Sequence, residues 1–119
     1  MSERRIGFSR QFTRDYKRLQ KHYPRIGDDL RDLMDQLKSG KTPGDQMQGV
    51  GRTVYKVRVR NRSAASGKRG GFRVLYYIQS VTATHLFAIF SKSKRDDISA
   101  NEIRRLLDEV DAEHPPDPS

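Results

Sequence analysis

Cysteine is absent from the 119 residues of this chain. Its absence excludes disulfide bonds, thiolate catalysis and cysteine-based zinc sites, and it is compatible with a reducing cytosol. Long apolar runs are also absent, since the longest are VLYYI and LFAIF, far too short to cross a bilayer. The N-terminus carries charges but no following apolar stretch, so no export signal is predicted. We therefore expect a cytoplasmic protein of about one domain.

Acidic residues are missing from the middle of the chain. Residues 46–95 contain eleven Lys or Arg and no Asp or Glu, whereas the rest of the chain has thirteen basic and fifteen acidic residues. The formal net charge of +9 therefore arises from this middle segment. Such a basic segment predicts a polyanion as partner, with nucleic acid first, an anionic membrane surface second and an acidic protein third.

Common cofactor motifs are missing as well. The chain has no GxxxxGK[ST], GxGxxG or HExxH motif, and the spacing of His22, His85 and His114 is not that of metal ligands. We therefore expect no metal and no nucleotide cofactor. His85 is better interpreted as a strand residue satisfied by a neighbour or by solvent than as a catalytic base. The carboxylates of residues 28–35 are expected to stabilise and solvate a helix.

Helices are predicted on both sides of the basic segment. An extended stretch at residues 6–8 precedes Ser9, which is placed to cap a first helix. Apolar residues at spacings of three and four predict a second helix over residues 26–37. Near the C-terminus, Ser99 and Glu102 have the spacing of a capping box at the start of a third helix.

Three strands are predicted between these helices, at residues 54–60, 72–78 and 84–91. Apolar and basic residues alternate in the first strand, so one face is apolar and the other carries Lys56 and Arg58. The other two strands are almost entirely apolar. The sheet is therefore expected to be covered on one side and only partly open on the other.

The order strand, helix, helix, three strands, helix predicts the fold class. We expect an α+β domain over residues 1–110, with helices packed on one face of an antiparallel sheet. Residues 111–119 are acidic and rich in proline, and they are expected to form a disordered tail.

The cationic face of the first strand is the strongest functional signal. Lys56, Arg58 and Arg60 project from it at intervals of about 6.5 to 7 Å, close to the spacing of successive phosphates in a nucleic acid. Like charges in such a row repel one another, so the row predicts a polyanionic ligand. Clustered cations can also serve RNA cleavage, because neighbouring arginines lower the pKa of a lysine and stabilise a phosphorane. These residues alone do not separate binding from cleavage.

Two sequence blocks resemble a known protein family. They are YKVRVR with GKRGGFRVLYYI, and LFAIFSKSKRDDISANEIRRLL. Over about residues 52–107 the chain resembles toxins of the RelE/ParE/HigB superfamily of type II toxin-antitoxin systems, and most closely the HigB-like branch. The resemblance implies a RelE-like fold and a metal-independent endoribonuclease, or mRNA interferase, that cleaves mRNA on the ribosome and inhibits translation. It also implies a cognate antitoxin of the helix-turn-helix type. Operator DNA would be contacted only by the complex of toxin and antitoxin.

The resemblance also implies which residues form the site. Lys56 is expected as the base, Arg58 and Arg73 as a clamp on the scissile phosphate, and Arg95 or Lys92 as the group that assists the leaving oxygen. The expected RNA-binding residues are Arg60, Lys68, Arg69 and Lys94.

One departure from the family leaves alternatives open. RelE enzymes carry a tyrosine near the start of the last helix, whereas the matching stretch here, ISANE, offers Ser99 and Asn101 and no aromatic residue. Tyr76 and Tyr77 in the second predicted strand are interpreted as packing residues. The sequence therefore also allows a ParE-like toxin that inhibits DNA gyrase without nuclease activity, or a non-catalytic nucleic-acid-binding module.

Overall fold

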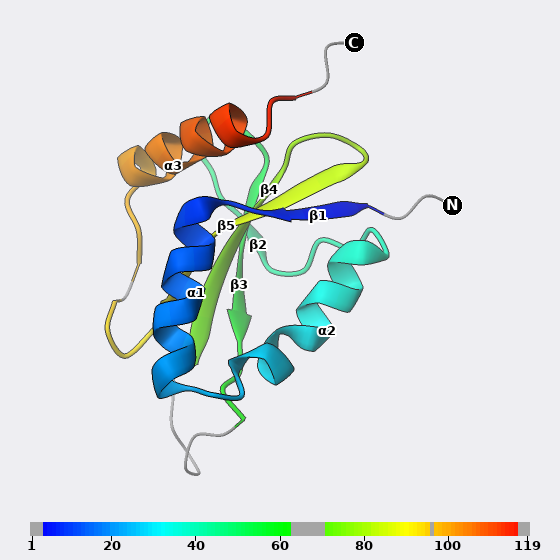
Figure 1. Ribbon diagram of the computed structural model, residues 1–119. Helices are drawn as coiled ribbons and strands as arrows, with labels where there is room; N and C mark the ends of the chain where they lie inside the picture. Colours follow the sequence, from blue (N-terminus) through cyan, green and yellow to red (C-terminus); the bar gives the residue numbers. More distant parts are fainter. Residues whose placement is uncertain (1–3, 63–70, 96, 117–119) are drawn as a thin grey trace.

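A computed structural model describes residues 4–62, 71–95 and 97–116 of the chain (Figure 1). Its elements are β1 (Arg5–Phe8), α1 (Arg10–His22), α2 (Ile26–Lys38), β2 (Asp45–Gln46), β3 (Val54–Val59), β4 (Phe72–Ile78), β5 (Ala83–Ser91) and α3 (Ala100–Glu113). The strands form one five-stranded sheet in the order β1-β5-β4-β3-β2. The α+β prediction is confirmed.

The sheet is mixed rather than purely antiparallel. β3, β4 and β5 pair antiparallel as predicted, but β1 lies along β5 in parallel, from Arg5 opposite Ala83 to Phe8 opposite Leu86. The short strand β2 pairs with β3 and lies between α2 and β3, where no strand was predicted. Local residue patterns specify neither strand pair, because β1 and β5 are far apart in the sequence and β2 is only two residues long.

The helices cover both faces of the sheet. On β4, Val74 packs in a core cluster with Leu30 of α2, whereas the next residue, Leu75, packs in a second cluster with Leu107 of α3. Successive strand residues point to opposite faces, so α3 lies on the face opposite α1 and α2. The expectation that all helices share one face is therefore wrong. β4 and β5 carry buried apolar residues on both faces, and both faces of the sheet therefore need helices packed against them.

Both predicted serine caps are confirmed. The Ser9 side chain accepts a hydrogen bond from the Phe12 N–H at 3.0 Å, and Ser99 accepts one from the Glu102 N–H at 3.1 Å. Among the helices that the structure describes, none is long and apolar enough to span a bilayer.

Helix α3 extends beyond residue 110, where the domain was predicted to end. The helix continues to Glu113, and the Asp111 carboxylate accepts hydrogen bonds from the Tyr77 hydroxyl at 3.2 Å and from the Gln79 side-chain amide at 3.0 Å. Residues 111–113 therefore belong to α3 rather than to the acidic tail. The polar contacts of Asp111 stabilise this last part of the helix. The spacing of apolar residues in the sequence does not reveal such contacts.

Candidate functional site

The register of the sheet brings four predicted site residues together. Arg58 on β3 lies directly opposite Arg73 on β4, and Lys56 shares their face two residues along β3. On β5, Phe90 lies opposite Arg73, and the Arg95 guanidinium sits over the Phe90 ring at 5.5 Å. We call Lys56, Arg58, Arg73 and Arg95 the basic site.

The basic site lies on the part of the α3 face that α3 leaves open. Val54, at the start of β3, is fully buried in the cluster under α3. Further along the same face, Lys56 and Arg73 are half-buried and Arg58 is exposed. The sheet therefore supports these side chains from beneath while solvent reaches them from above.

Arg58 and Arg73 are like charges placed side by side. Burial, and then the charge of Arg58, lower the pKa of Arg73. Among the residues that the structure describes, no carboxylate contacts Arg58. Directly opposed like charges destabilise a strand pair, so an anion bound between the two guanidiniums would relieve this repulsion. A phosphate suits the position, since guanidinium groups bind it in a bidentate manner.

Lys56 is held by a carboxylate that the sequence interpretation did not include. Its ammonium donates to both carboxylate oxygens of Asp97 at 3.2 Å. The backbone N–H of Ile98, and then Lys56, lower the pKa of Asp97, which keeps this carboxylate charged. The Asp97 side chain remains 56% exposed, and an ion pair this open contributes little stability and can exchange with another anion.

Arg95 is also paired. Its guanidinium donates to the Glu102 carboxylate and, at 2.9 Å, to the Asp97 carbonyl oxygen. Glu102 was expected to complete a capping box, but its carboxylate instead reaches back to Arg95. Lys56 and Arg95 are therefore each paired with an acidic residue that follows the basic segment in the sequence: Asp97 from the turn after β5 and Glu102 from α3.

Lys92 and Lys94 lie in that turn. The backbone N–H groups of Lys94 and Arg95 both donate to the Ser91 carbonyl, at 3.0 and 3.1 Å, which reverses the chain and returns Arg95 to the sheet. Lys92 is half-buried, and its charge contributes to the lowered pKa of Asp97. Lys92 therefore borders the basic site, whereas Lys94 is exposed on the turn.

The remaining predicted RNA-binding residues lie beside the loop between β3 and β4. Arg60 directly follows β3 and is exposed, while Lys68 and Arg69 fall outside the described residues. Gly71 begins the return into β4 with φ of +59°, and a Cβ there would collide with the Val59 carbonyl oxygen. A glycine at this position lets β4 approach β3 closely enough for Arg58 and Arg73 to meet.

The two tyrosines of β4 are occupied elsewhere. The Tyr76 hydroxyl donates to the Pro43 carbonyl, and the Tyr77 hydroxyl donates to Asp111 under α3. Burial raises the pKa of both phenols. Both side chains are buried in the core clusters, so their interpretation as packing residues is confirmed.

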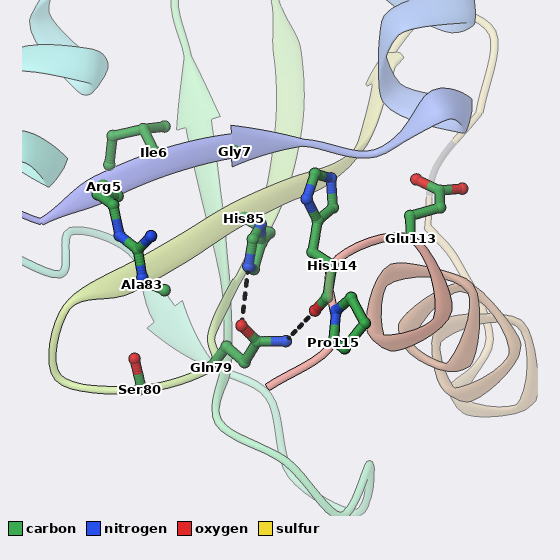
Figure 2. A pocket seen from close by; sticks show the side chains of 10 residues that line it. All are labelled: Arg5, Ile6, Gly7, Gln79, Ser80, Ala83, His85, Glu113, His114 and Pro115. Atoms are coloured by element: carbon green, nitrogen blue, oxygen red, sulfur yellow. Dashed lines mark hydrogen bonds between the residues drawn. The ribbon is translucent and has the colours of Figure 1, made fainter. Parts of the chain in front are cut away.

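A separate cavity of about 380 Å³ opens at the other end of β5 (Figure 2). His85 lies in its wall, 6% exposed, with Nε2 bonded to the Gln79 side-chain oxygen at 3.1 Å. The His85 ring stacks on that of His114, with ring centroids 4.8 Å apart. Burial, and then His114, lower the pKa of His85. Gln79 thus bonds one ring nitrogen of His85, as expected, but Nδ1 is buried and has no hydrogen-bond partner among the described residues. The residue lies five positions along β5 from Phe90, away from the basic site.

Comparison with protein families gives one match. The sequence model of a family described as "ParE toxin of type II toxin-antitoxin system, parDE" matches residues 6–96, which is more than half of the chain. The matched range runs from β1 to the turn after β5 and includes the whole basic site.

Proposed function

The chain belongs to the ParE toxin family of type II toxin-antitoxin systems, and we propose that within this family it acts as a metal-independent endoribonuclease that cleaves mRNA. Membership implies an antitoxin that binds and silences the toxin. The nuclease activity is our proposal, as are the helix-turn-helix type of the antitoxin, cleavage on the ribosome and the resemblance to the HigB-like branch.

One observation carries the nuclease proposal. Arg58 lies opposite Arg73, and Lys56 and Arg95 flank them on the same open face. RNA cleavage by its own 2′-hydroxyl passes through a phosphorane with two negative charges, and a cluster of fixed cations stabilises such a state more than it stabilises the substrate.

The proposed reaction needs no added cofactor. A base takes the proton of the 2′-hydroxyl, the 2′-oxygen attacks phosphorus, and the bond to the 5′-oxygen breaks as that oxygen receives a proton from an acid. The products are a 2′,3′-cyclic phosphate and a 5′-hydroxyl. We assign Arg58 and Arg73 to the phosphate, Lys56 to the 2′-hydroxyl, and Arg95 or Lys92 to the 5′-oxygen.

Asp97 and Glu102 also have a role in the proposed mechanism. Each carboxylate neutralises one cation of the basic site, at 3.2 Å in the pair between Asp97 and Lys56. Both pairs are partly exposed, so an entering phosphate competes with the carboxylates at low cost. The ion pairs thereby hold Lys56 and Arg95 in position. Both positive charges become available to the substrate when its phosphate displaces the carboxylates.

Brief expression of the wild-type chain tests the class of activity. We expect new mRNA 5′ ends at positions in phase with codons, within minutes of induction and before growth stops. Intact mRNA together with DNA-damage signalling would contradict the nuclease proposal.

Gyrase inhibition is the alternative that the family description favours. Its support is the name of the matched family, together with the lack of an aromatic residue in the stretch ISANE that begins α3. A supercoiling assay with purified gyrase separates the two functions. An inhibitor would block supercoiling at stoichiometric amounts, whereas a ribonuclease would leave supercoiling unchanged.

A further inference from the structure

Helix α1 carries a row of cations on its outer side. At 3.6 residues per turn, five basic residues of this helix fall within a sector of about 100°. All are exposed. We call these residues the α1 stripe: Arg10, Arg14, Lys17, Arg18 and Lys21. The opposite side of α1 places Phe12 in the core against the sheet, so the stripe points away from the molecule.

The centre of the stripe is not neutralised by neighbouring carboxylates. Arg18 pairs with Asp15 at 3.2 Å, and the Arg10 backbone N–H donates to Glu113 at 2.9 Å. Within the described part of the chain, no carboxylate contacts Arg14, Lys17 or Lys21. These three residues lie three and four positions apart, so the Cβ atoms of adjacent residues are about 5–6 Å from one another and their charges lie on one side of the helix.

On the other helices, several arginines are paired with carboxylates. On α2 and just before it, Arg31 and Arg25 both pair with Asp28, at 3.1 and 3.2 Å. On α3, Arg105 pairs with Glu109 at 2.9 Å. α1 has one pair of this kind, between Arg18 and Asp15, and the described residues place no carboxylate against its Arg14, Lys17 or Lys21.

The α1 stripe lies mostly apart from the basic site. α1 packs in the cluster that contains Val74, on one face of the sheet, while Leu75 and the basic site belong to the other face. The two surfaces approach each other at one point, where Arg18 and Arg95 line the same cavity of about 260 Å³. A ligand bound along Arg14, Lys17 and Lys21 therefore leaves the cleavage site open. A long nucleic acid can use both.

We propose that the α1 stripe binds the phosphate backbone of double-stranded nucleic acid. From Arg10 to Lys21 the row is straight and about 16 Å long, because an α-helix rises about 1.5 Å per residue. A straight, rigid row of flexible cations suits the regular backbone of a duplex, which is bound without reading bases. The inference does not depend on the nuclease proposal.

A single strand is the poorer ligand for this surface. Proteins that bind single strands stack the bases on exposed aromatic rings. The aromatic residues of α1, Phe12 and Tyr16, pack against the core cluster instead, and the exposed ring near the stripe is that of Phe8, just before the helix. The described part of the stripe thus lacks the series of exposed rings on which successive bases would stack. A lipid surface also fits poorly, since a membrane-binding helix inserts its apolar side, and that side of α1 is already buried.

Salt-dependent binding of the full chain tests the proposal. The ligands are DNA and 2′-O-methyl RNA duplexes of about 20 base pairs, with single strands of equal length, between about 50 and 200 mM salt. The stripe variant R14Q/K17Q/K21Q removes three charges from α1. The control R31Q/K38Q/K41Q removes three exposed charges on and after α2, so both variants have the same net charge. Glutamine is a good helix former, and equal thermal unfolding midpoints would show that both variants fold.

We expect the stripe variant to reduce the slope of log affinity against log salt for both duplexes by about 2 to 3, and the control by less than about 1. The variant R58Q/R73Q should abolish mRNA cleavage and leave the effect of the stripe on duplex binding unchanged. Equal losses in the stripe variant and the control would overturn the proposal, because net charge alone would then explain binding. An equal or larger effect on single strands would overturn it too, as would an effect confined to phosphatidylglycerol vesicles.

Discussion

At the scale of residues, the account depends on how each cation of the basic site is balanced. Arg58 and Arg73 meet across β3 and β4, while Lys56 and Arg95 each hold a carboxylate. In the proposed reaction the first pair receives the phosphate, and the two ion pairs keep the remaining cations in position. The strength of anion binding should therefore respond to the carboxylates as well as to the cations.

Asp97→Asn should strengthen RNA binding. Asparagine can still accept the Ile98 N–H, now bonded to Asp97 at 2.8 Å, but it no longer neutralises Lys56. We expect affinity for a 2′-O-methyl single strand to rise several-fold at low salt, and the salt slope to steepen by up to about 1. Asp35→Asn removes one exposed acidic charge from α2 and is the matched control. Equal affinities of the two variants would remove Asp97 from the site.

His85 should make the fold less stable in acid. Burial, and then His114, lower its pKa in the folded chain, so the unfolded chain binds this proton at a higher pH. The stability that neutral His85 provides is complete above the ordinary histidine pKa of about 6.5 and is lost as the pH falls below it. Urea unfolding near neutral pH and near pH 5 measures the loss. His85→Gln should show a smaller loss over this range; an identical loss would show that other groups cause it.

At the scale of elements, the sequence patterns predict most of the helices and strands. The two-residue period of β3 and the serine caps of α1 and α3 are local signals, and the structure confirms them. The parallel pairing of β1 with β5 joins segments about 80 residues apart, and the position of α3 depends on its packing against β4 and β5, so no local pattern encodes either.

The candidate site was predictable only in part for the same reason. Residue type and spacing identified the cations, but the contact of Arg58 with Arg73 requires the register of β3 and β4. Asp97 was not predicted as a site residue because it lies just beyond the acid-free segment. It reaches Lys56 only through the turn after β5. The motif KRDD was a signal for it, since it places acidic residues immediately after Arg95.

Gly71→Ala should destabilise the junction of β3 and β4. Gly71 has φ of +59°, and the added methyl group would collide with the Val59 carbonyl, so the strand must shift. We expect a loss of about 2–4 kcal/mol in the free energy of unfolding. Gly40→Ala is the matched control, because Gly40 also has positive φ but no heavy atom lies within 4 Å of its added Cβ, and it should lose only about 1–2 kcal/mol. Equal losses by chemical denaturation would contradict the steric explanation.

At the scale of the whole molecule, the positive charge is divided between two faces. Helices α1 and α3 lie in different layers of the molecule (Figure 1). The basic site occupies the open part of the α3 face, and the α1 stripe lies on the outer side of the opposite layer. Helices α2 and α3 together carry most of the carboxylates, and several of these pair with arginines of the same helix, as Asp28 does with Arg31, or of the β3 region, as Asp108 does with Arg52. If both proposals hold, the toxin binds a nucleic acid duplex on one surface and cleaves a strand at the other.

Mapping of mRNA 5′ ends in cells that express the Arg73→Ala variant tests the central claim most directly. At equal protein levels, with Arg25→Ala as a control outside the basic site, we expect codon-phased cuts for the wild type and the control. The Arg73→Ala variant should show none, while it still folds and still binds the antitoxin. Undiminished cleavage by Arg73→Ala would show that the basic site is not where RNA is cut.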